Sequence, residues 1–536
     1  MKVVIRSDAS LNIGAGHIMR CLTLAKALVE EGAMVEFICR EHSGHLIEKI
    51  RQEGFCVHTL PVEAFDHADS DAVAVQTKLF HADWLGASQS RDAEQCRSVL
   101  ESIMPDWLIV DHYAIDHTWQ TWLSGCFKKL MVIDDLGDRK HTCDLLLDQN
   151  YGATPDKYRD LVPESCKILT GTDYALLRPE FAKWRVTSLQ RRDASQELKN
   201  LLVTLGGVDP DNYTGAILTQ LAKTSLSDDM EITVVMGATA PHIKAIQAQA
   251  LEMPVNTVVK TNVSNMAELM ANADLAIGAA GATTWERCCL GLPTIQLVIA
   301  ENQRQIAEAL ARVNAILVLE SLYALPDLIK NAQLCLNDLS RVCRQIVDGK
   351  GVLRTLANLY VATESLPQST VFYDVLSYQS ASAEDVSAIL AMRNHPDIRK
   401  WMYQSEPIGL DEHKAFIEAL KERKDRCFLL VKLGGEIIGT INFTQINDEV
   451  GSAEFGIYAN PFNTLKGKGR VLIRLAEYYA QQNLKLSRLN LEVFTHNLRA
   501  QNLYKDVGFE FVEEREVHGH KVVCMSKKFD QKDNVR

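Results

Sequence analysis

One histidine in this sequence stands in a glycine loop, where it could act as a general base. The loop places Gly14 and Gly16 ahead of His17 and follows a short apolar run at residues 3–5. Glycines let the backbone approach a ligand, and the helix start that follows carries about half a positive charge. That charge favours a diphosphate and a neutral imidazole able to accept a proton, although a bound diphosphate would act in the opposite direction. The alternative is a tight turn with a structural histidine.

Two further glycine loops repeat this arrangement later in the chain. One contains Gly206 and Gly207, and the other contains Gly281. After Gly281, Thr283 could cap a helix or donate to a phosphate, and Glu286 could accept hydrogen bonds from ribose hydroxyls. The alternative role for Glu286 is compensation of the helix dipole. These loops extend the predicted diphosphate site to a second part of the chain.

A third type of loop, rich in cations, lies much nearer the carboxyl terminus. Small residues and three cations before an amphipathic helix can cradle a pyrophosphate, and a loop of solvated lysines is the alternative. The residues of this loop are Leu465, Lys466, Gly467, Lys468, Gly469 and Arg470.

Composition excludes several classes of protein. A hydrophobic fraction of 47% and a charged fraction of 24% over 536 residues are typical of a globular chain with several domains. A net charge of −12 excludes a nucleic-acid binder, which needs a basic face. The 13 cysteines show no zinc spacing, so we expect reduced thiols and no metal. With no signal region and no apolar run of about 20 residues, we expect a cytoplasmic protein without membrane contact.

The three glycine loops at Gly14, Gly206 and Gly281 require α/β units to position them. Unbroken apolar runs alternate with helical patterns, which is typical of parallel strands covered on both faces. We therefore predict two Rossmann-like halves, residues 1–190 and 191–363, whose strand ends meet at a cleft. The predicted strands of the first half are residues 3–5, 35–39, 107–110, 130–133 and 145–147, and those of the second are 201–205, 232–235, 275–277 and 294–297. Asp111, Tyr113 and Asp134 follow strand ends and should face the cleft, although Asp134 and Asp135 could instead form a turn.

The pattern changes after a polar segment at residues 364–370, which we interpret as a linker. We expect helices at 383–393 and 411–423, and then a hairpin of strands 428–433 and 436–443 around a Gly434-Gly435 turn. Strands at 453–458 and 489–494, two helices and a last strand complete the expectation. Residues 371–536 therefore form a predicted α+β domain.

The amino-terminal motif resembles that of the UDP-sugar hydrolases of pseudaminic acid synthesis, which are related to GT-B glycosyltransferases. It reads Arg6-x-Asp8-Ala9-Ser10-x-x-Ile13-Gly14-x-Gly16-His17-x-x-Arg20-Cys21, and the resemblance covers about residues 1–360. It implies hydrolysis of UDP-2,4-diacetamido-2,4,6-trideoxy-β-L-altropyranose with inversion, with His17 activating or positioning the water. It also implies that Asn302 contacts the substrate. Ala282 stands where the family often has serine, so a hydroxyl contact would have to come from Thr283.

The carboxyl-terminal domain resembles the GNAT N-acetyltransferases. The segment Asn497-Leu498-Arg499-Ala500-x-Asn502-Leu503-Tyr504-x-x-x-Gly508-Phe509 is similar to their coenzyme A motif and lies about 30 residues after the cationic loop. Thr464 departs from the usual Gln or Arg at the start of that loop. The resemblance implies acetyl-CoA as co-substrate, with the cationic loop and Asn497 binding it. Tyr504 would protonate the thiolate or only pack against the sulfur, and Glu454 would act as a base through water.

The two resemblances together imply consecutive steps of one pathway. Acetylation of UDP-4-amino-4,6-dideoxy-N-acetyl-β-L-altrosamine would directly precede the hydrolysis, so the expected partners are a UDP-activated amino sugar and acetyl-CoA. One alternative is a UDP-sugar glycosyltransferase joined to a protein N-terminal acetyltransferase. Another, of a different class, is a nucleotide-sugar-binding regulator.

Overall fold

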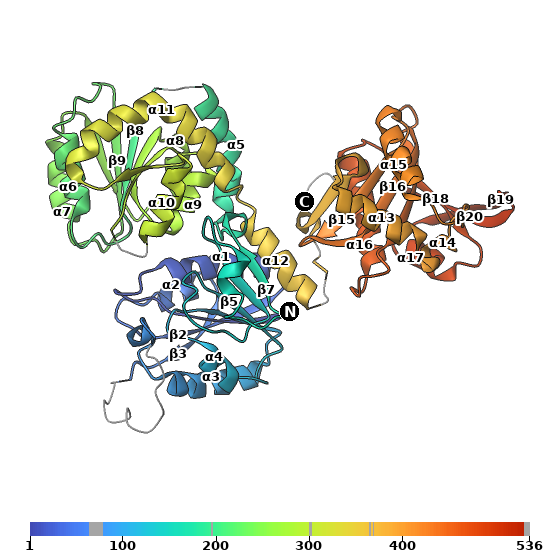
Figure 1. Cartoon of the computed structure of the whole chain (residues 1–536), viewed down its shortest axis with the longest axis horizontal. Coiled ribbons are helices and arrows are strands. Elements are labelled where there is room, and N and C mark those ends of the chain that lie inside the picture. The colour runs from blue at the N-terminus through green and yellow to red at the C-terminus, as the bar shows by residue number, and fades with distance from the viewer. Residues whose placement is uncertain (64–78, 195–196, 300–302, 364–365, 368, 530–536) are drawn as a thin grey trace. The chain divides into compact units, whose positions relative to one another are not determined.

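The structure of the chain is a computed structural model that describes residues 1–63, 79–194, 197–299, 303–363, 366–367 and 369–529 (Figure 1). The chain forms two compact units, Met1–Arg354 and Thr355–Arg536. The division falls within helix α12 (Gly351–Ala362), ahead of the predicted linker at residues 364–370. Among the described residues, no helix combines the length and the apolar character that crossing a bilayer requires.

The first unit contains two parallel sheets, one for each predicted half. The first sheet has the order β3-β2-β1-β4-β5-β6-β7 and the second the order β10-β9-β8-β11-β12-β13. The strands of the first are β1 (Lys2–Ser7), β2 (Met34–Arg40), β3 (Cys56–Leu60), β4 (Trp107–Asp111), β5 (Lys129–Ile133), β6 (Leu145–Asp148) and β7 (Lys167–Thr170). Those of the second are β8 (Asn200–Thr204), β9 (Glu231–Met236), β10 (Asn256–Thr261), β11 (Leu275–Ala279), β12 (Thr294–Leu297) and β13 (Leu317–Leu319).

Helices connect these strands and cover the sheets (Figure 1). In the first half they are α1 (Gly16–Glu30), α2 (Ile47–Gln52), α3 (Gln89–Ile103), α4 (His117–Trp122) and α5 (Pro179–Ala194). In the second they are α6 (Tyr213–Leu221), α7 (Ile243–Leu251), α8 (Met266–Asn272), α9 (Ala282–Cys289), α10 (Arg304–Arg312) and α11 (Leu325–Ile346). Helix α5 runs past the predicted boundary at residue 190 and ends at Ala194.

Strand order places the predicted loops where a ligand can enter each sheet. The chain moves from β1 to β2 on one side, whereas β4 lies on the other side of β1. The same reversal occurs between β8 and β11. Ligands of open α/β sheets bind beyond the strand carboxyl ends at such reversals. The loop with His17 follows β1, and the loops with Gly206 and Gly281 follow β8 and β11.

A buried ion-pair network joins three elements of the first half. The Arg6 guanidinium on β1 donates to Asp92 on α3 at 2.7 and 3.3 Å, and Arg40 on β2 donates to the same carboxylate at 2.7 Å. Asp8 lies 2.7 Å from Arg6 and accepts from the Arg40 backbone N–H at 2.6 Å. All four side chains are buried, so the network fixes the start of the His17 loop against its neighbours.

The second unit is a mixed sheet with helices, as predicted. Its order is β14-β15-β16-β17-β18-β20-β19, and β17 and β18 are a parallel pair among antiparallel neighbours. The strands are β14 (Tyr373–Ser377), β15 (Cys427–Leu433), β16 (Glu436–Asn447), β17 (Ser452–Ala459), β18 (Arg488–Phe494), β19 (Glu510–Val517) and β20 (His520–Lys528). The helices are α13 (Ala383–Asn394), α14 (Pro396–Arg399), α15 (Leu410–Ala419), α16 (Lys468–Gln482) and α17 (Leu498–Asp506).

Candidate active sites

His17 forms a dyad with a carboxylate at the end of the neighbouring strand. It is the second residue of α1, and its Nδ1 lies 2.6 Å from Oδ1 of Asp111, the last residue of β4. Because a carboxylate only accepts hydrogen bonds, Nδ1 carries the proton and Nε2 is left as the basic nitrogen. The His17 side chain is buried. The arrangement is that of an oriented general base.

Arg20 anchors the carboxylate of this dyad. Its Nε and Nη2 donate to the two oxygens of Asp111, each at 2.7 Å. Burial alone would raise the pKa of Asp111, but the Arg20 guanidinium and the His17 imidazole outweigh burial and hold that pKa well below its usual range. Asp111 therefore stays anionic and keeps the imidazole oriented. In the sequence, Arg20 was recognised only as part of the amino-terminal motif, and the role of Asp111 stayed open.

Of the other two side chains predicted to face this site, Tyr113 reaches it and Asp134 does not, and Asp135 lies there in place of Asp134. The Tyr113 ring meets the His17 ring edge to face at 4.7 Å, and its hydroxyl donates to Asp135 at 2.5 Å. Asp134 instead lies 2.8 Å from Arg139 and accepts from the Gly137 N–H at 2.9 Å. The turn that was the alternative for Asp134 is therefore what the structure shows, and Asp135 is the acid that faces the dyad.

The loop before α1 leaves its helix start open. Gly14 has a φ of 79°, which side-chain-bearing residues rarely adopt, and its N–H closes the loop on the Ser10 carbonyl at 2.9 Å. No side chain caps α1, whose first residue is Gly16. The first amides of α1 thus point their partial positive charge toward the space beside His17.

The loop with Gly206 and Gly207 differs from the loop before α1, because a side chain of the protein caps the first amides of the helix that follows it. Asp209 accepts from the amides of Tyr213 and Thr214, at 2.9 and 2.8 Å, at the start of α6. The sequence predicted a second helix start open to phosphate here, and this part of the prediction is wrong. Only the glycine backbone, with Gly206 at a φ of 100°, is left to face a ligand.

The loop with Gly281 keeps its helix start accessible. The hydroxyl that closes the turn belongs to Thr284, which accepts from the Gly281 N–H at 3.3 Å, so the capping role predicted for Thr283 is wrong. Thr283 Oγ1 instead accepts from a guanidinium at 3.2 Å. Glu286 pairs with Arg178 at 3.2 Å, and burial raises the pKa of Glu286 although the guanidinium opposes that shift.

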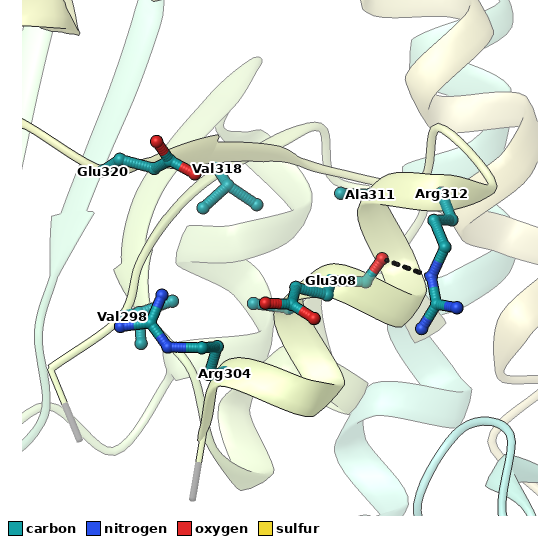
Figure 2. Close-up of a pocket in the computed structure, with 8 residues that line it drawn as sticks. Val298, Arg304, Glu308, Ala311, Arg312, Val318 and Glu320 are labelled. Atoms are coloured by element: carbon teal, nitrogen blue, oxygen red, sulfur yellow. Dashed lines mark hydrogen bonds between the residues drawn. The ribbon is translucent and has the colours of Figure 1, made fainter. Parts of the chain in front are cut away.

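A pocket of about 490 Å³ lies in the same half but does not include the glycine loops (Figure 2). Figure 2 shows side chains from α10 on one wall and from the end of β13 on the other. Its lining is Val298, Arg304, Ala307, Glu308, Ala311, Arg312, Val318 and Glu320. None of these was a predicted site residue. Asn302, the predicted substrate contact nearest in sequence, lies outside the described residues.

In the second unit, the cationic loop presents fewer cations than expected. Gly467 ends the loop at a φ of 81° and precedes α16. The Lys468 ammonium turns inward and donates to the carbonyls of Asn460, at 2.8 Å, and Asn463. The predicted cradle of three cations is therefore wrong for Lys468, which braces the loop. Arg470 lies 3.4 Å from an exposed carboxylate on the neighbouring helix.

The strands that lead to this loop part from each other. The parallel pairing of β17 and β18 ends at Glu454 and Asn490, although β17 continues to Ala459 and β18 to Phe494. Backbone N–H and C=O groups beyond the last pair have no neighbour in the ladder, as at a sheet edge, and can bind an extended ligand. Helix α16 follows β17 and α17 follows β18, so both motifs that resemble coenzyme A sites begin where the strands part.

Tyr504 on α17 lies beside this interruption. Its ring packs edge to face on Phe455, at 6.0 Å, and near Phe509. Phe455 is the first residue of β17 after the last pair. Burial raises the pKa of Tyr504 to about 12, so its proton is held more firmly than in a free tyrosine. Asn497 caps α17 by accepting from the Ala500 N–H at 3.2 Å.

Glu454 does not share a face with Tyr504. Successive side chains of a strand alternate between faces, so Glu454 points away from Phe455 and from the tyrosine that packs on it. It accepts from Gln445 at 2.9 Å, and its pKa is raised by burial and by the nearby Glu492 carboxylate. A carboxyl group with a raised pKa fits a base that acts through water, but not one in contact with Tyr504.

Sequence patterns missed a group of rings beside Glu492, which we call the aromatic cluster. Tyr403 donates to Glu492, and Phe494 stacks on His520 at 4.8 Å. Flat apolar faces next to carboxylates suit a ligand with both rings and an amine. The cluster consists of Trp401, Tyr403, Phe494, His496, His518 and His520. No spacing signal links these residues, since they come from three separate parts of the domain, at residues 401–403, 494–496 and 518–520.

One group of side chains in the described part of the chain has the spacing of metal ligands. Donor atoms of Glu36, Cys56 and His58, on β2 and β3, lie within 4.8 Å of one another. The His58 ring nitrogen and the Glu36 carboxylate are 2.7 Å apart, which a simple hydrogen bond explains.

Comparison with known proteins agrees with this division. Residues 395–509 match the acetyltransferase (GNAT) family, and residues 200–341 match the glycosyltransferase family 28 C-terminal domain. Over 314 residues the chain is 26% identical to the UDP-2,4-diacetamido-2,4,6-trideoxy-beta-L-altropyranose hydrolase of Campylobacter jejuni, covering 58% of this chain and 97% of that protein. Over 151 residues it is 32% identical to the acetyltransferase PseH of the same species, covering 28% and 92%.

A third relative has the length of the whole chain. An uncharacterized protein of Methanocaldococcus jannaschii is 25% identical over 529 residues, which cover 95% of this chain and 97% of the relative. The predicted fold class is confirmed: two Rossmann-like halves of the GT-B type precede a GNAT domain. The chain thus belongs to the GNAT acetyltransferases through its C-terminal domain, which resembles PseH and is fused to a front part of the UDP-sugar hydrolase and glycosyltransferase family 28 type.

Proposed function

We propose that this chain catalyses two consecutive steps of pseudaminic acid biosynthesis. The C-terminal domain acetylates the 4-amino group of UDP-4-amino-4,6-dideoxy-N-acetyl-β-L-altrosamine with acetyl-CoA. The front part then hydrolyses the UDP-2,4-diacetamido-2,4,6-trideoxy-β-L-altropyranose to the free sugar and UDP. The observation that carries this proposal is the His17–Asp111 dyad beside an open helix start, in a chain whose relatives include the hydrolase and the acetyltransferase.

In the hydrolysis, His17 acts as general base. Its Nε2 takes a proton from water while the water oxygen attacks the anomeric carbon, the bond from that carbon to the diphosphate oxygen breaks, and UDP leaves with the electron pair. Asp111 balances the charge of the imidazolium that forms. Amides at the starts of α1 and α9 stabilise the negative charge on the departing diphosphate.

The UDP-sugar occupies the glycine loops in this proposal. Glu286 accepts from the ribose once its pairing with Arg178 is exchanged for the ligand, and Thr283 and Asn302 contact the diphosphate and the sugar. The backbone contacts come from Gly14, Gly16, Gly206, Gly207 and Gly281.

In the acetyl transfer, the amine nitrogen attacks the thioester carbon, and the carbon–sulfur bond breaks. The thiolate takes a proton from Tyr504, and a water held by Glu454 takes the proton of the amine. The pantetheine arm lies where β17 and β18 part, and the start of α16 binds the pyrophosphate. The contributing residues are Leu465, Lys466, Gly467, Gly469, Arg470 and Asn497, with Lys468 holding the loop. The aromatic cluster receives the acceptor.

One incubation tests both steps. The protein is mixed with the UDP-4-amino sugar and acetyl-CoA, and free CoA, UDP and hexose are followed. H17A should stop UDP release and spare CoA release, and Y504F should slow CoA release and spare hydrolysis of the pre-acetylated sugar. The exposed residues His117 and Tyr478 provide the controls H117A and Y478F, which should change neither.

Two results would contradict the proposal. Loss of both activities in a folded single variant would show that the sites are not separate. A requirement for an added acceptor before UDP is released would instead favour the glycosyltransferase alternative.

A further inference from the structure

Arg287, under the loop with Gly281, is a buried cation without an ion-pair contact. The Glu286 carboxylate next to it in the sequence acts on it only at a distance and pairs with Arg178 instead. Three arginines are fully buried in this chain's described part, and the other two, Arg6 and Arg40, pair with carboxylates. Arg287 forms no ion pair among the described residues. Its Nη2 donates to the Ala279 carbonyl at 2.9 Å and to two neutral side-chain oxygens, those of Thr284 at 3.2 Å and Gln296 at 3.3 Å.

The guanidinium lies at the positive end of its own helix. Side chains of an α-helix point back toward its amino terminus, so Arg287 reaches the first turn of α9 and donates to Thr283 at 3.2 Å. A β-carbon placed on Gly278 would lie 2.6 Å from Nη1, so the loop backbone rests directly on the guanidinium. A β-carbon placed on Gly281 would meet no atom within 4 Å. The loop therefore separates a buried charge from open space.

A second buried arginine, Arg192 near the end of α5, shows how a buried guanidinium can be compensated. Arg192 also lacks a carboxylate at hydrogen-bond distance, but it donates to the carbonyls of Met270, Ala273 and Leu290 at 2.8 to 3.0 Å. Those carbonyls lie at the carboxyl ends of α8 and α9, where helix dipoles are negative. Arg287 has the opposite placement, because the dipole of α9 adds to its charge. Burial of a cation with no carboxylate in contact is costly, and an anion at the loop would offset that cost.

We propose that Arg287 is the buried counter-charge for the diphosphate of the bound UDP-sugar and of the departing UDP, acting through the Gly278–Gly281 backbone without touching the ligand. The inference rests on the proposed function and adds a positioning residue to it. Because the guanidinium is buried, the interaction is weakly screened and grows as negative charge develops on the leaving UDP.

Gln296 allows this charge to be cancelled almost without changing shape. Its Oε1 accepts from Arg287, whereas its Nε2 is buried without a hydrogen-bond partner. Q296E replaces that unpartnered nitrogen with oxygen, so it removes no hydrogen bond and places a carboxylate against the guanidinium. The variant should therefore fold, and its ligand-free melting temperature should be equal to or above that of the wild type.

The decisive measurement is the affinity for UDP relative to uridine, determined by calorimetry on the full chain. Uridine fills the nucleoside part of the site but carries no diphosphate. We expect Q296E to bind UDP at least about tenfold more weakly and uridine within twofold of wild type. R192Q is the matched control, since it should lower the melting temperature and leave the UDP-to-uridine ratio unchanged.

R287Q removes the same positive charge in a second, independent way. It should also lower the affinity for UDP relative to uridine. An unchanged ratio in folded Q296E or R287Q would overturn the role of Arg287 while leaving the hydrolase proposal intact. A wild-type protein that bound UDP no better than uridine would overturn both.

Discussion

His17 takes its orientation from a carboxylate 94 positions away in the sequence. The glycines beside it made the histidine recognisable, because a loop that exposes backbone amides is a local pattern. Its partner could not be recognised in that way. Asp111 reaches His17 only because β4 lies beside β1, with Ser7 level with Asp111 in the ladder. The same applies to Asp135: the sequence indicated Asp134 as the residue that faces the cleft, but Asp134 binds within the turn at Gly137 and Asp135 contacts Tyr113 instead.

The dyad predicts a large effect of D111N on hydrolysis. An asparagine amide can donate to Nδ1, which would move the imidazole proton to Nε2 and remove the basic nitrogen. We expect UDP release to fall about 100-fold or more, with CoA release unchanged. The measurement is the initial rate of UDP release from pre-acetylated substrate. D156N, at an exposed carboxylate, is the control, and normal hydrolysis by folded D111N would rule out the dyad.

The raised pKa of Tyr504 predicts the pH dependence of acetyl transfer. A group with a pKa of about 12 stays protonated up to about pH 11, so loss of its proton should not lower the rate between pH 6 and 10. We expect Y504F to lower kcat about 10- to 100-fold while the KM for acetyl-CoA stays within twofold. Rates of CoA release across this pH range provide the measurement.

Packing against the sulfur is the alternative role for Tyr504, and it gives a different result. If the ring only packs, Y504F keeps the wild-type kcat. A rate that fell near pH 10 in wild type and not in Y504F would show instead that the hydroxyl ionises at an ordinary pKa.

At the scale of elements, the sequence identified central strands and missed the edges. Apolar runs such as residues 107–110 and 275–277 are buried on both faces, and each forms a strand. The strands that were not predicted are β3, β7, β10, β13, β14 and β19, and each lies at an edge of its sheet. Edge strands have fewer neighbours, so polar side chains are tolerated there, as in the almost wholly exposed β19.

Helix starts were also only partly predictable, because similar glycine loops lead to different caps. The loops before α6 and α9 both follow a central strand, and both looked open to phosphate. Asp209 closes the first from within the loop, at a φ of 44°, which the sequence does not announce. Thr284 leaves the second largely open. Only the hydrogen-bond distances in the structure distinguish the closed helix start of α6 from the open one of α9.

The buried network of Arg6, Arg40 and Asp92 predicts a strong dependence of stability on one carboxylate. D92N leaves two guanidinium groups buried without their shared partner, so we expect the free energy of unfolding to fall by about 3–5 kcal/mol. Urea unfolding at pH 7 measures it. E94Q, on the exposed face of the same helix, should change the free energy by less than about 0.5 kcal/mol.

The same network fixes the sign of the pH dependence. Although burial would raise the pKa of Asp92, the guanidinium of Arg6 and that of Arg40 lower it below the ordinary value in the folded protein. The carboxylate therefore contributes stability above its unfolded pKa, near pH 4, and this contribution is lost as the pH falls through the folded pKa. The difference between wild type and D92N should shrink as the pH is lowered from 7. A difference that stayed constant down to pH 3 would contradict this assignment.

At the scale of the whole molecule, the two proposed activities share one chain without sharing residues. The family 28 match ends at residue 341 and the GNAT match begins at residue 395. The proposed hydrolase and acetyltransferase residues fall on opposite sides of the division in α12. Each proposed site should therefore be lost or kept by itself, and what the fusion would add is a covalent tether between the two.

Proximity predicts a dependence on dilution that two single-site variants can reveal. A tethered second site has an effective concentration set by the connection rather than by the bulk protein. In a mixture of H17A and Y504F chains, the acetylated sugar must leave one molecule and find another. We expect the lag before free hexose appears to lengthen as this mixture is diluted, and to change little for the wild type. Both samples are full-length and contain equal amounts of each working site, so folding and stoichiometry are matched. Equal lags at every dilution would mean that the intermediate always equilibrates with solution, and that joining the two domains gives no kinetic advantage.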